Sequence, residues 1–381
     1  MAVRDLATVA QRYGLEVGSP QLRSIGPIGF GPDGILFAAD SDAATIYAIA
    51  LGQDGSEDSS EAGSPDGAAP AVSGIDSQLA VLLGCNREDV HIQDMAAAPD
   101  GSAVYLSVMR GSGKSAQPIL ARVSPDGAIE EVELEQVPFA ATVIADAPDP
   151  GDSREDIRVV PQGEPADEER EYGGVHLRLA RQPLRRVVVT DLAYVDGALL
   201  VAGASNEEFS SRLRKIAFPF KDDAVSSSLE IFHVSHGRYE TASPIRTFAP
   251  YGEMSILASY TCTPLVRFSI ADLQPGAQAK GTTVAELGSM NTPLDVVSYR
   301  NGNADYVLVS NSRHPLLKFA AADLEGQQAL VTPREPVGPE RTTLPHEGVS
   351  RMANWNGTHV LMLQRTSSGA IDLRAYDSAT L

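Results

Sequence analysis

Three aspartates stand in the same local pattern, each directly before an apolar residue that opens a β-prone run. They are Asp94, Asp191 and Asp295, in Gln-Asp-Met, Thr-Asp-Leu and Leu-Asp-Val. A carboxylate at such a place can bind a ligand or a metal ion, or it can accept hydrogen bonds from backbone amides of a neighbouring structural unit. The sequence leaves both roles open.

Two asparagines also recur in one pattern, each after an apolar run. The segments are Ser-Asn206-Glu-Glu-Phe and Ser-Asn311-Ser-Arg-His314. Asparagine carbonyl oxygens combined with carboxylates form the oxygen cages that Ca²⁺ and similar hard cations prefer. In such a site Asp295 or His314 is a candidate general base.

Arginine supplies most of the positive charge in a strongly acidic chain. Fifty acidic residues stand against thirty basic ones, only five of which are lysine, and the net charge is −20. This excess of negative charge argues against nucleic acid as a partner. Guanidinium groups fixed on an acidic molecule would focus an anion toward them. The candidates are Arg110, Arg246, Arg313 and Arg351.

The sequence lacks several other signals. It has no Gly-x-Ser-x-Gly elbow and no helix-borne zinc motif, and Cys85 and Cys262 match no metal or redox spacing. No apolar run approaches the roughly 18 residues of a membrane span, and residues 1–14 hold no signal-peptide core. We therefore expect a cytoplasmic protein without a membrane partner. A periplasmic or secreted location is the alternative if a leader was removed.

The elements that would position these residues recur along the chain. Each recurrence contains a turn ending in glycine, which supplies the positive φ of tight hairpins. The six turns are Gly-Pro-Asp-Gly at 31–34, Ala-Pro-Asp-Gly at 98–101, Tyr-Val-Asp-Gly at 194–197, Ala-Pro-Tyr-Gly at 249–252, Tyr-Arg-Asn-Gly at 299–302 and Asn-Trp-Asn-Gly at 354–357. The β-prone runs that follow are Ile35–Ala39, Val104–Val108, Leu199–Ala202, Ile256–Tyr260, Tyr306–Val309 and Val360–Leu363.

A third strand follows each of these runs. The third strands are Thr45–Leu51, Ile119–Val123, Leu213–Phe218, Leu265–Ile270, Leu316–Ala320 and Ile371–Tyr376, and weaker fourth strands are visible at Ile129–Leu134, Leu229–Val234 and Thr283–Leu287. Repeated four-stranded units are typical of β-propeller blades. The sequence therefore predicts an all-β, six-bladed β-propeller that occupies residues 1–381 as a single domain.

The spacing of the six glycines predicts two insertions. The intervals are 67, 96, 55, 50 and 55 residues, whereas a blade takes about 40 to 50. Residues 52–74 and 146–174 are acidic and rich in glycine or proline, so we expect disordered loops that add nothing to a core. Seven blades, with one hidden in the 96-residue interval, is the alternative. Because the last repeat has three strands, we expect Leu15–Leu22 to supply its fourth strand and close the ring.

The first repeat carries a resemblance to a known family. Residues 26–40 read Gly-Pro-Ile-Gly-Phe-Gly-Pro-Asp-Gly-Ile-Leu-Phe-Ala-Ala-Asp. This resembles blades of the superfamily that holds NHL-repeat proteins and the senescence-marker-protein (gluconolactonase-like) group; the other repeats match by pattern only. The resemblance implies a divalent cation such as Ca²⁺ at the central channel, with Asn206, Asn311 and Asp295 at matching positions. The acidic ligand expected from the first blade is missing, since the chain there reads Ser24-Ile-Gly-Pro.

Propeller topology gathers the candidates at one end. We letter the four strands of a blade A to D from the axis outward. The D–A and B–C loops then lie on one face of the ring and the A–B turns on the other. Ligands of propellers usually bind on the face where the D–A and B–C loops converge. The residues expected at that funnel are Asp94, Arg110, Asp191, Asn206, Arg246, Asp295, Asn311, Arg313, His314 and Arg351.

Two functions fit such a funnel. The first is a binding propeller that receives a small polar or anionic ligand, or a loop of a partner protein. The second is a lactonase-like or esterase-like hydrolase, in which a divalent cation held by Asn206, Asp295 and Asn311 polarises the carbonyl and Asp295 or His314 acts as base.

Overall fold

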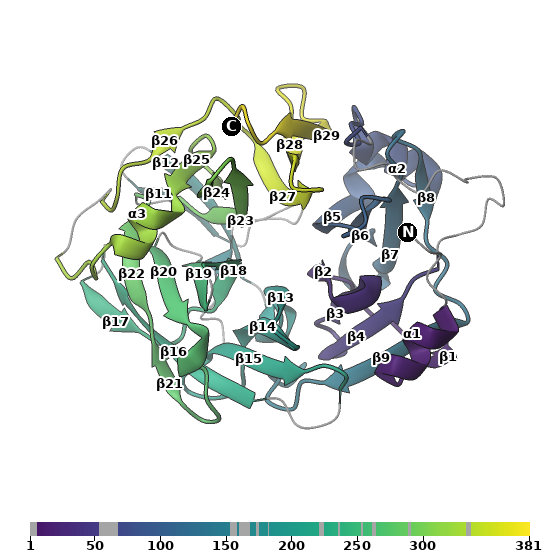
Figure 1. Cartoon of the computed structure of the whole chain (residues 1–381), viewed down its shortest axis with the longest axis horizontal. Helices are drawn as coiled ribbons and strands as arrows, with labels where there is room; N and C mark the ends of the chain where they lie inside the picture. Colours follow the sequence, from purple (N-terminus) through teal and green to yellow (C-terminus); the bar gives the residue numbers. More distant parts are fainter. Residues whose placement is uncertain are drawn as a thin grey trace.

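The protein is a six-bladed β-propeller in which small antiparallel sheets surround a central axis (Figure 1). The computed structural model describes residues 6–52, 68–152, 158–159, 168–172, 175–181, 183–220, 225–234, 237–252, 254–260, 264–288, 291–332 and 337–381. The predicted all-β class and blade number are confirmed. The 96-residue interval holds no seventh blade among its described residues; besides strands of blades 1, 2 and 3 it contains a small sheet of β10 (Arg158–Val159), β12 (Val175–Arg181) and β11 (Glu168–Tyr172).

The blades are numbered here by the chain order of their inner strands. Blade 1 contains β2 (Ile28–Phe30), β3 (Ile35–Asp40), β4 (Thr45–Ala50), β9 (Val137–Val143) and β1 (Glu16–Gly18). Blade 2 contains β5 (Val90–Ala97), β6 (Val104–Arg110), β7 (Gln117–Val123) and β8 (Ile129–Glu131). Blade 3 contains β13 (Asp191–Val195), β14 (Ala198–Ala204), β15 (Ser211–Ala217), β16 (Val225–His233) and β17 (Arg238–Glu240), with β21 (Gln278–Lys280) parallel to β16.

The remaining blades follow in chain order. Blade 4 contains β18 (Ile245–Tyr251), β19 (Ser255–Tyr260), β20 (Pro264–Ser269) and β22 (Thr282–Glu286). Blade 5 contains β23 (Pro293–Asn301), β24 (Ala304–Asn311), β25 (Leu317–Ala320) and β26 (Thr342–Thr343). Blade 6 contains β27 (Val349–Trp355), β28 (His359–Arg365) and β29 (Ile371–Asp377). The α-helices described are α1 (Leu6–Tyr13), α2 (Ile75–Leu83) and α3 (Ala321–Gly326).

The order of blades around the ring differs from their order along the chain. The inner strand β2 of blade 1 lies between β5 of blade 2 and β13 of blade 3, and β5 also contacts β27 of blade 6 (Figure 1). The ring order is therefore 2, 1, 3, 4, 5, 6. The chain starts blade 1, builds blade 2 on one side of it, returns through β9 to add an outer strand to blade 1, and continues to blade 3 on the other side.

The local sequence explains the strands and turns. Every residue of β3, β4 and β14 is buried, because a middle strand packs against a neighbouring blade on each face. All six predicted turn glycines have a positive φ, from 60° at Gly302 to 81° at Gly197. The predicted hairpins are thus confirmed.

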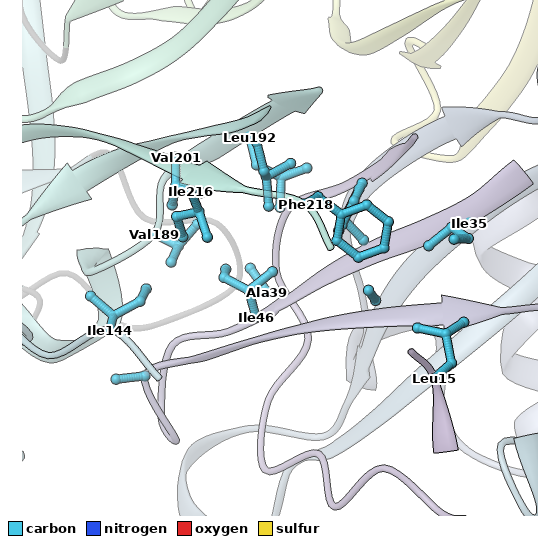
Figure 2. Close-up of a cluster of buried hydrophobic side chains, with 14 of the residues drawn as sticks. Leu15, Ile35, Ala39, Ile46, Ile144, Val189, Leu192, Val201, Ile216 and Phe218 are labelled. Carbon is cyan, nitrogen blue, oxygen red and sulfur yellow. The ribbon is translucent and has the colours of Figure 1, made fainter. Parts of the chain in front are cut away.

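The core consists of apolar clusters between neighbouring blades rather than around the axis. One cluster joins Ile35, Ala39 and Ile46 of blade 1 to Val201 and Ile216 of blade 3 (Figure 2). Equivalent clusters lie between blades 2 and 6, 3 and 4, 4 and 5, 1 and 2, and 5 and 6. The interdigitated apolar side chains hold the ring together.

The expectation that Leu15–Leu22 closes the last blade was wrong. Strand β1 instead pairs with β9 at the outer edge of blade 1. Beside β29 of blade 6 lies Val72, whose backbone exchanges two hydrogen bonds with Leu373, at 2.9 and 2.8 Å. The reason is the ring order: blade 2 stands between blade 1 and blade 6, so a segment attached to blade 1 is not adjacent to blade 6.

The two predicted insertions lie partly outside the described residues. Residues 53–67, 153–157, 160–167 and 173–174 are not described, so disorder there stays a prediction. The bounds of the first insertion differ from those expected, since Val72 is 5% exposed and belongs to the core between blades 2 and 6. Val72 could not be recognised as a core residue from the sequence, because it is a single apolar residue among Ala, Pro, Ser and Gly. None of the helices that the structure describes has the length and apolar character needed to cross a membrane.

Candidate functional site

The three aspartates of the repeated pattern lie on the inner strands β5, β13 and β23, and each joins its blade to a neighbouring one. Asp94 Oδ2 accepts a hydrogen bond from the backbone N–H of Ile28 at 2.9 Å. Asp191 Oδ2 accepts one from Phe248 at 2.7 Å. The third, at 2.6 Å, runs from the Met352 N–H to Asp295 Oδ2. These bonds connect blade 2 to 1, blade 3 to 4 and blade 5 to 6. Of the two roles left open, hydrogen bonding to neighbouring amides is the one whose contacts are present.

A break in the strand register lies at this level of the inner strands. The pairing with the second strand shifts between Ile92 and Asp94, and again between Pro293 and Asp295. The same shift occurs in β18 before Thr247 and in β27 before Arg351. A β-bulge bends a strand and re-aims its side chains. Polar groups at this level of separate blades form the axial cluster: Asp94, Asp191, Arg246, Thr247, Asp295 and Arg351.

Arg351 fills a structural role in this axial cluster. Its Nε donates to the backbone oxygen of Gln93 at 2.7 Å, and Nη1 donates to the backbone oxygens of Ser350 at 2.8 Å and Leu294 at 3.4 Å. The Nε atom also lies 3.6 Å from Asp94 Oδ1. Arg351 therefore connects blades 5, 6 and 2, and its charge is balanced by Asp94.

Arg246 differs from Arg351 because its Nε has no such partner in the part of the chain that the structure describes. Its Nε is enclosed by protein and makes no hydrogen bond to any residue that the structure describes. The charges that act on it are those of Arg351 and Asp295. Burial and the Arg351 charge together lower the pKa of Arg246 to about 10, and Asp295 opposes that shift. It therefore remains a cation at neutral pH.

The carboxylates of the cluster are hard to ionise. Burial, then the charges of Asp94 and Asp295, raise the pKa of Asp191 to about 8. Burial raises the pKa of Asp295 to about 7 against the opposing charge of Arg351. The pKa of Asp94 is also raised by burial, although Arg351 acts to lower it. The side chains of Asp94 and Arg351 keep 19% and 18% exposure, so the cluster is surrounded by protein but remains in contact with solvent.

The expected cation ligands do not form a cation site. Asn311 is buried, its Oδ1 accepts from Asn291 Nδ2 at 2.9 Å, and its Nδ2 donates to Val309. Both carboxylate oxygens of Asp295 accept backbone hydrogen bonds, and Asn206 is exposed in the loop after β14. Within the described ranges, no group of three or more His, Cys, Asp or Glu residues could hold a metal ion. The residues present therefore do not fit the divalent cation.

The other candidates lie apart from the axial cluster. Arg110 lines a shallow hollow of about 380 Å³ formed with Cys85, Asp89 and the loop after β6. Arg313 and His314 are exposed in the loop after β24. The structure thus brings together Asp94, Asp191, Arg246, Asp295 and Arg351.

One residue of the cluster was missed by the sequence analysis. Thr247 Oγ1 donates to Asp295 Oδ1 at 3.2 Å and so connects blades 4 and 5. It precedes the buried Phe248 just as Asp191 precedes the buried Leu192. Aligning all six inner strands on that buried residue would have found it.

Comparison with known proteins gives matches to solved structures and none in sequence. No protein-family model matches the chain, and no curated protein matches it in sequence. Solved propeller-like structures are similar over most of its length. They include the PQQ-bound aldose sugar dehydrogenase from Streptomyces coelicolor, at 12% identity and a TM-score of 0.36 over 95% of this chain and 96% of the other. They also include hydrazine synthase from Kuenenia stuttgartiensis (10%, 0.40, 95% and 97%) and virginiamycin B lyase from Staphylococcus aureus (9%, 0.36, 94% and 98%).

Proposed function

We propose that the protein is a binding propeller that receives a small anion at its axial cluster, with Arg246 as the pairing group. The observation that carries this proposal is the Nε of Arg246, which is enclosed by protein and has no hydrogen-bond partner among the described residues. Native proteins rarely enclose a charged donor without a partner, because the lost hydration is not replaced. An anion bound from solution would supply that partner.

The neighbours of Arg246 support an anion rather than a cation as the ligand. Asp94 is balanced by Arg351, while burial keeps Asp191 largely protonated at neutral pH. The two guanidiniums therefore face carboxylates that carry less than their full negative charge. Guanidinium forks suit carboxylate and phosphate oxygens, and both are candidate ligand groups.

Isothermal titration calorimetry with acetate, sulfate and inorganic phosphate tests this function. In the Arg246→Met variant we expect the affinity for the anion that binds to fall by about 10- to 100-fold, since a charged hydrogen bond contributes about 1.5–3 kcal/mol. The matched control is Arg300→Met, because Arg300 lies on β23 but is exposed and paired with Asp305. If no anion binds the wild-type protein, or if both variants bind equally, the proposal is wrong.

A further inference from the structure

Arg246 and Asp295 lie on β18 and β23, the neighbouring inner strands of blades 4 and 5. Arg246 lies in β18, and the next residue, Thr247, donates a hydrogen bond to Asp295 Oδ1 at 3.2 Å. The two opposite charges attract each other, yet the Nε of Arg246 makes no hydrogen bond within the described chain. Asp295 is thus a counter-charge that acts on Arg246 without satisfying its Nε donor.

We infer that an external anion binds at Arg246 together with one proton, which Asp295 takes up. This inference rests on the proposed anion site and adds the class of ligand that the site accepts. While Asp295 is ionised, its negative charge balances Arg246 and repels a second anion. Protonation removes this internal competitor and leaves the guanidinium to the ligand. One anion and one proton bind together, and no other species takes part.

The other charged groups of the cluster leave Asp295 as the proton acceptor. Asp94 on β5 is paired with Arg351 on β27 at 3.6 Å, and the Arg351 charge opposes the burial that raises the pKa of Asp94. Asp191 on β13 faces the like charges of Asp94 and Asp295, and it is already largely protonated at neutral pH. Asp295 is the cluster carboxylate whose charge raises the pKa of Arg246. Its own pKa of about 7 means that it is close to half ionised near pH 7.

The balance of charge indicates a singly charged ligand. With Asp191 protonated and Asp94 counted as one pair with Arg351, ionised Asp295 offsets Arg246 and the cluster is neutral. Protonation of Asp295 leaves one positive charge. A monoanion such as a monocarboxylate restores neutrality, whereas a dianion would leave an excess negative charge in a partly desolvated place. We therefore expect acetate to bind in preference to sulfate.

The test is the pH dependence of acetate binding, measured by calorimetry. Acetate stays ionised over the whole range, so any change reports on the protein. We expect a constant affinity below about pH 7 and a fall that approaches about tenfold per pH unit above it, because one proton must then be bound with each anion. In Asp295→Asn the affinity should no longer depend on pH over this range. The control Asp305→Asn changes an exposed carboxylate and should keep the wild-type slope.

Several outcomes would overturn the inference. Acetate affinity that is the same at about pH 6 and about pH 8 excludes proton uptake, and an unchanged slope in Asp295→Asn excludes this residue as the acceptor. If that variant does not fold, wild-type titrations in two buffers of different ionisation enthalpy replace it. Close to one proton taken up per acetate at about pH 7.5 supports the inference, and none contradicts it. Binding without pH dependence leaves the proposed function intact, whereas no binding of any anion at any pH removes both.

Discussion

Asp295 of blade 5 accepts a 2.6 Å hydrogen bond from the backbone N–H of Met352 in blade 6. The carboxylate thus joins two blades across an interface in which Tyr299 and Leu308 pack against Met352 and Met362. Asp94 and Asp191 do the same at two other interfaces. The same residues that surround Arg246 therefore also hold the ring in register, and stability and binding can be measured on one set of variants.

Loss of one such carboxylate should weaken the fold. Asp191→Ala removes the acceptor for the Phe248 N–H and leaves that donor unsatisfied. We expect the free energy of unfolding to fall by about 1–3 kcal/mol, measured by urea denaturation. Asp305→Ala, which removes an exposed carboxylate paired with Arg300, should change it by no more than about 0.5 kcal/mol. Equal changes in the free energy of unfolding of the two variants would show that the hydrogen bond between blades 3 and 4 does not stabilise the fold.

The raised pKa values predict a loss of stability as the pH rises. An aspartate has a pKa of about 3.9 in the unfolded chain, but burial raises that of Asp191 to about 8 and that of Asp295 to about 7. The folded state then binds more protons than the unfolded state between these values, so the stabilisation is complete below about pH 4 and is lost as the pH rises through 7 and 8. Asp191→Asn mimics the protonated form. Its free energy of unfolding relative to wild type should increase from about pH 5 to about pH 8, and a constant difference would refute the assignment.

Arg246→Met should not destabilise the protein. The substitution removes a desolvated cation that lacks a partner for its Nε, and it retains an apolar side chain of similar length. We expect the free energy of unfolding in anion-free buffer to stay the same or to rise by about 1 kcal/mol. A loss of more than about 1 kcal/mol would indicate that Arg246 stabilises the ring itself and would weaken the case for a ligand.

Arg214 provides the contrasting case of a buried arginine in which each of the three guanidinium nitrogens donates a hydrogen bond. Its guanidinium donates to Asp146 Oδ1 at 2.7 Å and to the backbone oxygens of Val188 and Ala204. Arg214→Met leaves these three acceptors without their donor, and we expect a loss of about 3–5 kcal/mol in thermal or chemical unfolding. The control Arg374→Met breaks an exposed pair with Asp372 and should cost less than about 1 kcal/mol.

We expect Val72 to stabilise the closure of the ring, although its flanking sequence is typical of a loop. Val72→Asp places a charge in the core between blades 2 and 6, where Val72 is 5% exposed. We expect a loss of at least about 3 kcal/mol in the free energy of unfolding. Val331→Asp, at a valine that is 64% exposed, should have little effect. Comparable stability of the two variants would mean that the Val72 bridge is dispensable.

Much of the fold follows from local signals that the sequence displays. The turn glycines and the apolar runs after them are set by backbone sterics and by burial on both faces, so Gly34 and Ile35–Asp40 could be placed without a structure. The position of β9 could not, because pairing between β4 and β9 depends on which edge the returning chain meets, and neither strand carries a residue that specifies it.

The candidate site was predictable to a similar extent. The repeated pattern around Asp94, Asp191 and Asp295 indicates equivalent places in three blades, and the structure brings these residues together. The contrast between Arg246 and Arg351 was not predictable. It depends on whether carbonyl oxygens such as that of Gln93 lie within hydrogen-bond distance, and the packing of neighbouring blades decides this.

The return of the chain through β9 has a consequence for synthesis on the ribosome. Strands β2 to β4 are synthesised before blade 2. The strand that covers the outer edge of β4 is β9, which begins only at Val137, so this edge stays unpaired while all of blade 2 is translated. An exposed β-edge is a template for pairing with other chains. Nascent chains that stop between residues 51 and 136 carry this open edge, and those that extend past Val143 can cover it. The period of greatest aggregation risk during translation therefore ends with β9.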